Sequence, residues 1–124
     1  MFIFLVILIS DQLASFVKHY FDRPRPCHED FMKYGRFIAK RCGKYGFYSA
    51  HASTTFALAT FFILQLKEKL PRIHFWLIPW AIIVTYSRIY IGVHYPGDIL
   101  VGCIIGLFIG LLFSRTNNKI KTVQ

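Results

Sequence analysis

Acidic residues are scarce in this sequence. Six Asp and Glu residues stand against 15 Lys and Arg residues, which gives a formal net charge of +9. The chain has only three cysteines, and it contains neither internal repeats nor low-complexity runs. Nothing in it resembles a nucleic-acid-binding module, so we expect no nucleic-acid partner. Because the chain is otherwise apolar, the basic excess points to anionic lipid headgroups or phosphate.

The apolar content limits the fold class. Of the 124 residues, 55% are hydrophobic and 18% are aromatic, and the mean hydropathy is +0.44. A chain of this length forms one domain, and its composition is too apolar for an ordinary soluble domain. We therefore expect membrane spans. The N-terminal segment has neither a clear basic start nor a small-residue cleavage site, and we therefore interpret it as a membrane helix rather than a secretory signal.

Four apolar segments predict a single all-α domain over residues 1–124, a polytopic membrane helix bundle of about four transmembrane helices. Because consecutive spans cross in opposite directions, the first and third spans end on the same face on which the second and fourth begin. The predicted spans cover residues 1–17, 50–66, 73–93 and 98–113, and a polar loop covers residues 18–47.

Residues that can do chemistry gather at this shared face. A cation can hold an anionic substrate, an imidazole can attack it or move a proton, and a carboxylate can orient the imidazole. The agreement in placement is the strongest internal evidence for a site. The residues are Lys18, Arg25, Ser49, His51, Arg88, His94 and Asp98.

Two further features concern packing between helices. Asp11 lies within the first span, and we interpret it as a polar group that hydrogen-bonds another helix rather than as a catalytic residue. Gly102, Gly106 and Gly110 recur on one face of the last span, where small residues let helices approach closely. This face could pack inside the bundle or form a dimer, so the oligomeric state stays open.

Two of the three cysteines, Cys27 and Cys42, lie in the polar loop. They form a disulfide if the loop faces an oxidising compartment, or remain free thiols if it does not, and the sequence does not decide between these states. A zinc site built from Cys27, His28 and Cys42 lacks a fourth ligand at a typical spacing. We therefore expect no metal.

Three polar stretches resemble the motifs of the type 2 phosphatidic acid phosphatase family, which are integral-membrane lipid phosphate phosphatases. The family's first motif is K-x6-R-P, the second is P-S-G-H and the third is S-R-x5-H-x3-D. Order and placement both match. The corresponding residues are Lys18, Arg25 and Pro26, then Tyr48 to His51, then Ser87, Arg88, His94 and Asp98.

The resemblance implies a role for each residue. His94 would be the nucleophile, Asp98 would hold its tautomer, and His51 would protonate the leaving oxygen and then activate water. Phosphoryl transfer needs mainly positioning and charge stabilisation, which fixed cations supply without a metal or any other cofactor. The groups that would bind the phosphoryl oxygens are Lys18, Arg25, Arg88, Ser49 and the amide of Ala50.

The chain departs from the family pattern in two ways. Tyr48 stands where the family has proline, and Ala50 stands where it has glycine. Alanine forbids unusual backbone angles, so a site that needs a positive φ there would be distorted, and we expect reduced or altered activity. Family members usually have six spans, whereas about four are expected here, as if the first two were missing.

The resemblance implies hydrolysis of a phosphorylated lipid among membrane lipids. Undecaprenyl pyrophosphate is the first choice, because residues 44–51 resemble bacterial members that act on polyprenyl pyrophosphate. Phosphatidic acid, phosphatidylglycerol phosphate and a lipid A phosphate come next. The expected location is the bacterial inner membrane, with the active face extracytoplasmic. The alternatives are a non-catalytic phospholipid-binding homologue or fragment, and a small four-helix transporter that would depend on Asp11.

Overall fold

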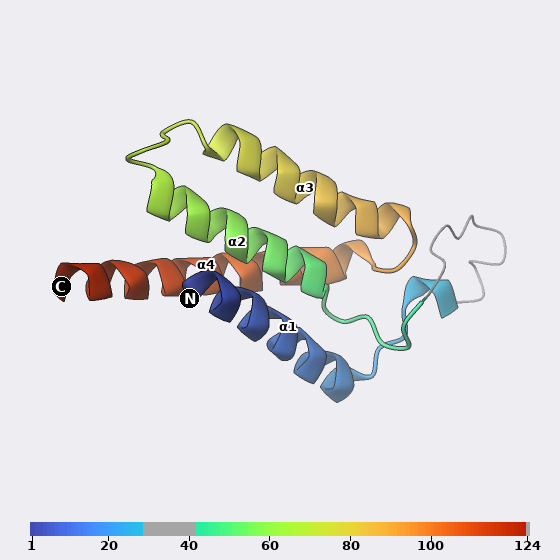
Figure 1. Ribbon diagram of the computed structural model, residues 1–124. Coiled ribbons are helices and arrows are strands. Elements are labelled where there is room, and N and C mark those ends of the chain that lie inside the picture. The colour runs from blue at the N-terminus through green and yellow to red at the C-terminus, as the bar shows by residue number, and fades with distance from the viewer. Residues whose placement is uncertain (29–41, 124) are drawn as a thin grey trace.

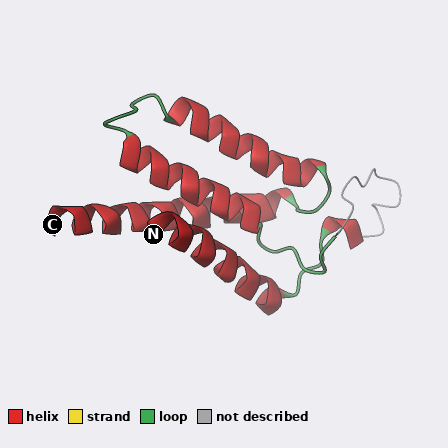
Figure 2. Ribbon diagram, in the orientation of Figure 1, coloured by secondary structure: helices red, strands yellow, loops and turns green. Residues whose placement is uncertain are grey.

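The part of the chain that the structure describes forms a bundle of four α-helices. The computed structural model describes residues 1–28 and 42–123. In this part of the chain, helices and loops are present but no strand, apart from one isolated bridge between Pro24 and Tyr45 (Figure 2). The predicted all-α bundle is confirmed. The elements are α1 (Phe2–Phe21), the 3-10 helix η1 (Pro26–His28), α2 (Ala50–Leu66), α3 (His74–Tyr90) and α4 (Pro96–Val123) (Figure 1).

Two helices extend beyond the apolar runs that predicted them. Helix α1 continues past residue 17 and is ended by Asp22, which adopts a left-handed conformation with φ 47° and donates its N–H to Lys18 O. Helix α4 continues past residue 113 to Val123. No proline or glycine follows Gly110, so nothing ends the helix where its apolar run ends.

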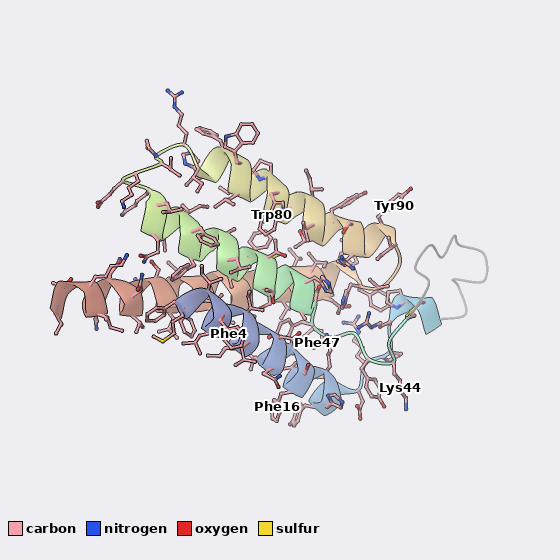
Figure 3. All side chains as sticks on the ribbon, in the orientation of Figure 1. Phe4, Phe16, Lys44, Phe47, Trp80 and Tyr90 are labelled. Atoms are coloured by element: carbon pink, nitrogen blue, oxygen red, sulfur yellow. A yellow bond between two sulfur atoms is a disulfide. The ribbon has the colours of Figure 1, made fainter. Side chains whose placement is uncertain are left out.

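The outer surface of the bundle is largely apolar. Helices α1 and α4 are long and apolar enough to cross a membrane, and α2 is a shorter apolar helix. The side chains of Phe16 and Tyr90 are 71% and 67% exposed and point away from the bundle (Figure 3). Exposed aromatic and aliphatic groups of this density suit contact with lipid.

Helix α2 is the centre of the bundle and packs against the other three helices. Its closest neighbour is α4, whose glycines face the α2 backbone. A Cβ atom added at Gly102 would lie 2.7 Å from Ser49 O, and one at Gly110 would lie 2.6 Å from Ala57 O. The face formed by these glycines therefore packs against α2 inside the bundle, which is one of the two uses that the sequence left open.

The α1–α2 and α3–α4 connections lie at the same end of the bundle. The last turns of α1 and α3 and the first turns of α2 and α4 lie together there, as the alternation of the segments predicted (Figure 1). Below them, Tyr48 is fully buried and packs against Ala14 of α1 and Ala50 of α2. This apolar contact ties α1 to α2 directly under the polar residues.

The close approach of α2 and α4 predicts a strong size limit at Gly106. A Cβ atom there would overlap Ser53 O, so Gly106→Ala should force the helices apart and lower the free energy of unfolding by about 1–3 kcal/mol. The matched control is Gly97→Ala on the same helix, where an added Cβ meets nothing within 4 Å. Unfolding in detergent micelles would be measured for both variants. Equal stability of the two would contradict the packing described above.

Candidate active site

A cavity of about 290 Å³ opens at the end of the bundle where the polar residues meet. It contains six of the eight residues that the sequence predicted for the site, contributed by α1, α2, α3 and two loops. Residues from all three motifs therefore lie on its wall. Its wall is formed by Asp11, Lys18, Arg25, Ala50, His51, Arg88, Ile91, Val93 and His94.

Asp98 lies next to His94 and outside the cavity wall. Helix α3 ends at Tyr90, and after its C-cap Ile91 comes Gly92 with φ 77°, a conformation that favours glycine. This turn directs the chain back to the bundle, where His94 is 3% and Asp98 1% exposed. His94 Nδ1 lies 3.5 Å from Asp98 Oδ2, which leaves Nε2 as the ring nitrogen available to the cavity.

The surroundings of His94 favour the neutral ring. Burial lowers the pKa of the imidazole below its ordinary value, and the positive charges of Arg25 and Lys18 act in the same direction, while Asp98 opposes them. Only a neutral imidazole has a free lone pair for attack on phosphorus. The site thus holds a histidine that can act as a nucleophile and that Asp98 can stabilise once the ring becomes positive.

Three cations face the same cavity. Lys18 reaches it from the last turn of α1, Arg88 from the last turn of α3, and Arg25 from the loop before η1. The Nε atom of Arg88 is buried without a hydrogen-bond partner among the described residues. An unpaired buried donor is costly, so this group is suited to an anionic oxygen in the cavity.

Arg25 is fixed by the segment that precedes α2. Its Nε donates to Tyr45 O at 3.0 Å, next to the bridge between Pro24 and Tyr45. A Cβ atom at Gly46 would lie 2.9 Å from Arg25 Cγ, so glycine allows this close contact. The side chain of Arg25 is thus held in place by contacts with the backbone of the segment that precedes α2.

A disulfide joins Cys27 and Cys42, with their Cα atoms 6.6 Å apart. Of the two states that the sequence left open for these cysteines, the structure contains the bonded one. The bridge joins the chain two residues after Arg25 to the segment that carries Tyr45. Among the residues that the structure describes, no group of three or more His, Cys, Asp or Glu side chains could hold a metal ion.

The second motif is divided between the cavity and the core. Ala50 and His51 line the cavity, whereas the Ser49 side chain is buried and caps α2 by accepting the N–H of Ala52 at 3.3 Å. Direct phosphate binding by Ser49 stays a prediction. Ala50 is helical, and Asp22 is the one non-glycine residue with positive φ in the described ranges. The alanine therefore imposes no backbone strain here.

Sequence reasoning missed Arg23. Its Nη1 lies 3.2 Å from Asp98 Oδ1 and donates a hydrogen bond to it. The residue lies in the polar loop predicted over residues 18–47, and the motifs assign it no role. Only the folding of this loop onto the start of α4 identifies its partner.

Asp11 also has a different environment from the one expected. Its carboxylate makes no hydrogen bond to another helix within the described residues, and it lines the cavity instead. Asp11 also lines a groove of about 360 Å³ between α1 and α2, which continues along Phe4, Ile7 and Leu8. Ala50 and His51 are shared between the cavity and the groove as well.

The disulfide should matter for anion binding because it holds the segment that carries Arg25. We expect the Cys27→Ser, Cys42→Ser double variant to bind inorganic phosphate about tenfold more weakly, since the arginine must then be ordered on binding. Calorimetry in detergent would measure this. A reductant should weaken binding to the unaltered protein and leave the double variant unchanged. Equal affinity of both proteins would show that the bridge is irrelevant to Arg25.

Known proteins are similar to this chain over most of its length. A family model described as the PAP2 superfamily matches residues 1–121. The lipid A 4'-phosphatase of Porphyromonas gingivalis is 42% identical over 113 residues, covering 87% of this chain and 46% of that protein. The lipid A 4'-phosphatase of Bacteroides thetaiotaomicron is 36% identical, covering 94% and 52%. The chain thus spans about half the length of these relatives.

A solved structure has the same fold. The transmembrane PAP2-type phosphatidylglycerolphosphate phosphatase of Bacillus subtilis superposes with a TM-score of 0.78 at 25% identity, covering 95% of this chain and 58% of that one. The family match extends over nearly the whole chain, and its apolar helices fit the same conclusion. The chain is therefore a membrane protein of the PAP2 superfamily, the type 2 phosphatidic acid phosphatases whose motifs its sequence resembles.

Proposed function

We propose that this protein hydrolyses the phosphate ester of a membrane lipid, without a metal, through a covalent phosphohistidine. One observation carries the proposal: a buried histidine, backed by a carboxylate, faces a second histidine and three cations across one cavity. The names of the relatives, all phosphatases of lipids, support the same class of reaction.

In the first step, Nε2 of His94 attacks the phosphorus atom, and a P–N bond forms as the bond from phosphorus to the lipid oxygen breaks. His51 donates a proton to the departing oxygen, so the lipid leaves as an alcohol, or as a monophosphate when the substrate is a pyrophosphate. Asp98 stabilises the positive ring of His94. Lys18, Arg25 and Arg88 neutralise the phosphoryl oxygens.

In the second step, water replaces the histidine. His51, now neutral, accepts a proton from the water, whose oxygen attacks phosphorus while the P–N bond breaks. The electron pair of that bond returns to His94, and inorganic phosphate leaves the cavity. Dividing the displacement into two steps lets one pair of histidines act in turn as nucleophile and as proton carrier.

The groove between α1 and α2 is where we place the lipid. In-line displacement puts the leaving oxygen opposite the nucleophile, and the groove adjoins the cavity at His51. His94 lines the cavity and not the groove. Beyond Asp11 the α1 wall of the groove is apolar, with Phe4, Ile7 and Leu8, and suits an acyl or prenyl chain.

We rank a lipid A-type phosphate monoester as the first substrate to test. The two relatives compared above are both named lipid A 4'-phosphatase and match most of this chain. Undecaprenyl pyrophosphate, the first choice from sequence, becomes the second candidate. The same cations and histidines would serve either substrate, because both present a terminal phosphoryl group.

We also propose that the active face is extracytoplasmic, in a bacterial inner membrane. The disulfide between Cys27 and Cys42 lies on the face that carries the cavity. Disulfides form and persist in oxidising compartments and are rare in the cytosol. This supports exposure of the cavity to the periplasm or the exterior.

The first prediction from this function is metal-independent turnover. The purified protein in detergent, with EDTA present, should release inorganic phosphate from a lipid A-type monoester, and undecaprenyl pyrophosphate should be offered in parallel. His94→Ala should reduce release to background, because the nucleophile is lost. Protein quenched with alkali during turnover should carry a base-stable, acid-labile phosphoryl group, and His94→Ala should carry none.

The controls decide between turnover and binding. Release that EDTA abolishes would refute the metal-free mechanism. Lipid binding by a folded protein that releases no phosphate from either substrate would instead favour a non-catalytic lipid-binding homologue or fragment.

A second prediction concerns the lipid groove. Thr54 lines it beyond the cavity, so Thr54→Trp should obstruct the chain of a lipid substrate and lower kcat/KM for it by at least about tenfold. Hydrolysis of a small soluble phosphate monoester should be unchanged. Ile83→Trp on the exposed face of α3 is the control, since that side chain is 68% exposed. Equal loss with both substrates would place the lipid elsewhere.

A further inference from the structure

The carboxylate of Asp98 receives donors on both of its oxygens. Arg23 Nη1 donates to Oδ1 at 3.2 Å, and the backbone N–H of Tyr95 donates to Oδ2 at 2.9 Å. His94 Nδ1 faces Oδ2 at 3.5 Å. The plane of the carboxylate is thus determined by Arg23 on one side and by Tyr95 on the other.

We propose that Arg23 is a positioning residue, which acts on the nucleophile through Asp98. Its contact with Oδ1 holds the carboxylate in the orientation that directs Oδ2 at His94 Nδ1. This contact favours the tautomer with the proton on Nδ1 and the lone pair on Nε2. The inference rests on the proposed function, and it adds a residue that the cavity wall does not contain.

Arg23 is itself held in place for this task. Its guanidinium carbon lies 4.7 Å from the centre of the Tyr95 ring and 6.0 Å from that of Phe47, within the range of cation–π contacts. Its carbonyl accepts the N–H of Gly46 at 3.0 Å. A planar guanidinium stacked in this way is better suited to a fixed contact than the flexible ammonium of lysine.

The charges around His94 define what Arg23 should change. Four positively charged or titratable groups (Lys18, Arg25, Arg88 and His51) and the carboxylate of Asp11 share the cavity with the ring, and Asp98 lies behind it. A carboxylate that is 1% exposed needs compensation. Without Arg23, a protonated His94 ring would be the closest positive charge to the Asp98 carboxylate. Protonation of His94 then becomes more favourable, and the pKa of His94 should rise.

The test uses Arg23→Gln and Arg23→Lys in the full chain. Arg23→Gln should lower kcat by about 10- to 100-fold, the worth of a hydrogen bond to a charged group. The acid limb of the kcat/KM profile should move to higher pH, because neutral His94 is then lost at higher pH. KM and inhibition by inorganic phosphate should stay unchanged. Arg23→Lys should restore part of kcat, whereas Arg25→Gln on the cavity wall should weaken phosphate inhibition.

A second variant separates positioning from a general loss of structure. In the Asp98→Asn background, Arg23→Gln should cause no further loss, since its target is already neutral. An equal loss in both backgrounds, or a raised KM without a shift of the acid limb, would overturn the inference.

The inference can also be tested apart from turnover. Nitrogen-15 NMR of the imidazoles gives the pKa of His94 in the unaltered protein and in Arg23→Gln. A raised pKa in the variant supports the positioning role even if no lipid is hydrolysed, whereas an unchanged pKa refutes it.

Discussion

Asp98 is the point at which the polar segments of the chain are joined. Its carboxylate contacts Arg23 and His94, and its backbone carbonyl accepts the N–H of Ser49 at 3.2 Å. These contacts join the loop after α1, the turn before α4 and the start of α2. A buried carboxylate at the first turn of a helix is also favoured by the helix dipole. One residue therefore sets the relative positions of a proposed nucleophile, an arginine and a helix start.

This arrangement depends on packing far from any charge. Ser49 reaches Asp98 because α2 and α4 lie close together, and they do so because Gly102 and Gly106 have no Cβ atoms. On the other side, Tyr48 fills the space between α1 and α2 under the cavity. In a membrane the hydrophobic effect contributes little to helix association, so small residues and fitted aromatic groups are the main means of fixing the geometry.

The sequence predicted the helical class and most of the candidate site. The site could be predicted because consecutive spans cross the membrane in opposite directions. This brings the polar ends of the four segments, and the three motifs on them, to one face. It did not predict the ends of α1 and α4, because helices continue through polar residues that lack a terminating signal. It also missed Arg23 and the cavity position of Asp11, because partners 75 residues apart are chosen by loop folding, as for Arg23 and Asp98. No local sequence pattern shows which distant residue becomes the partner.

The division between cavity and groove explains why the motifs indicate a phosphoryl group but not the lipid. The motif residues on the cavity wall surround the proposed phosphate position, whereas the groove is lined mostly by residues outside the motifs, such as Phe4, Ile7 and Leu8. Apolar contacts are non-directional and tolerate changes of chain, so they discriminate weakly between acyl and prenyl groups. Polar groups discriminate more strongly, and Asp11 lies where the groove meets the cavity. A carboxylate there can accept hydrogen bonds from a hydroxyl-bearing headgroup, which a prenyl chain cannot supply.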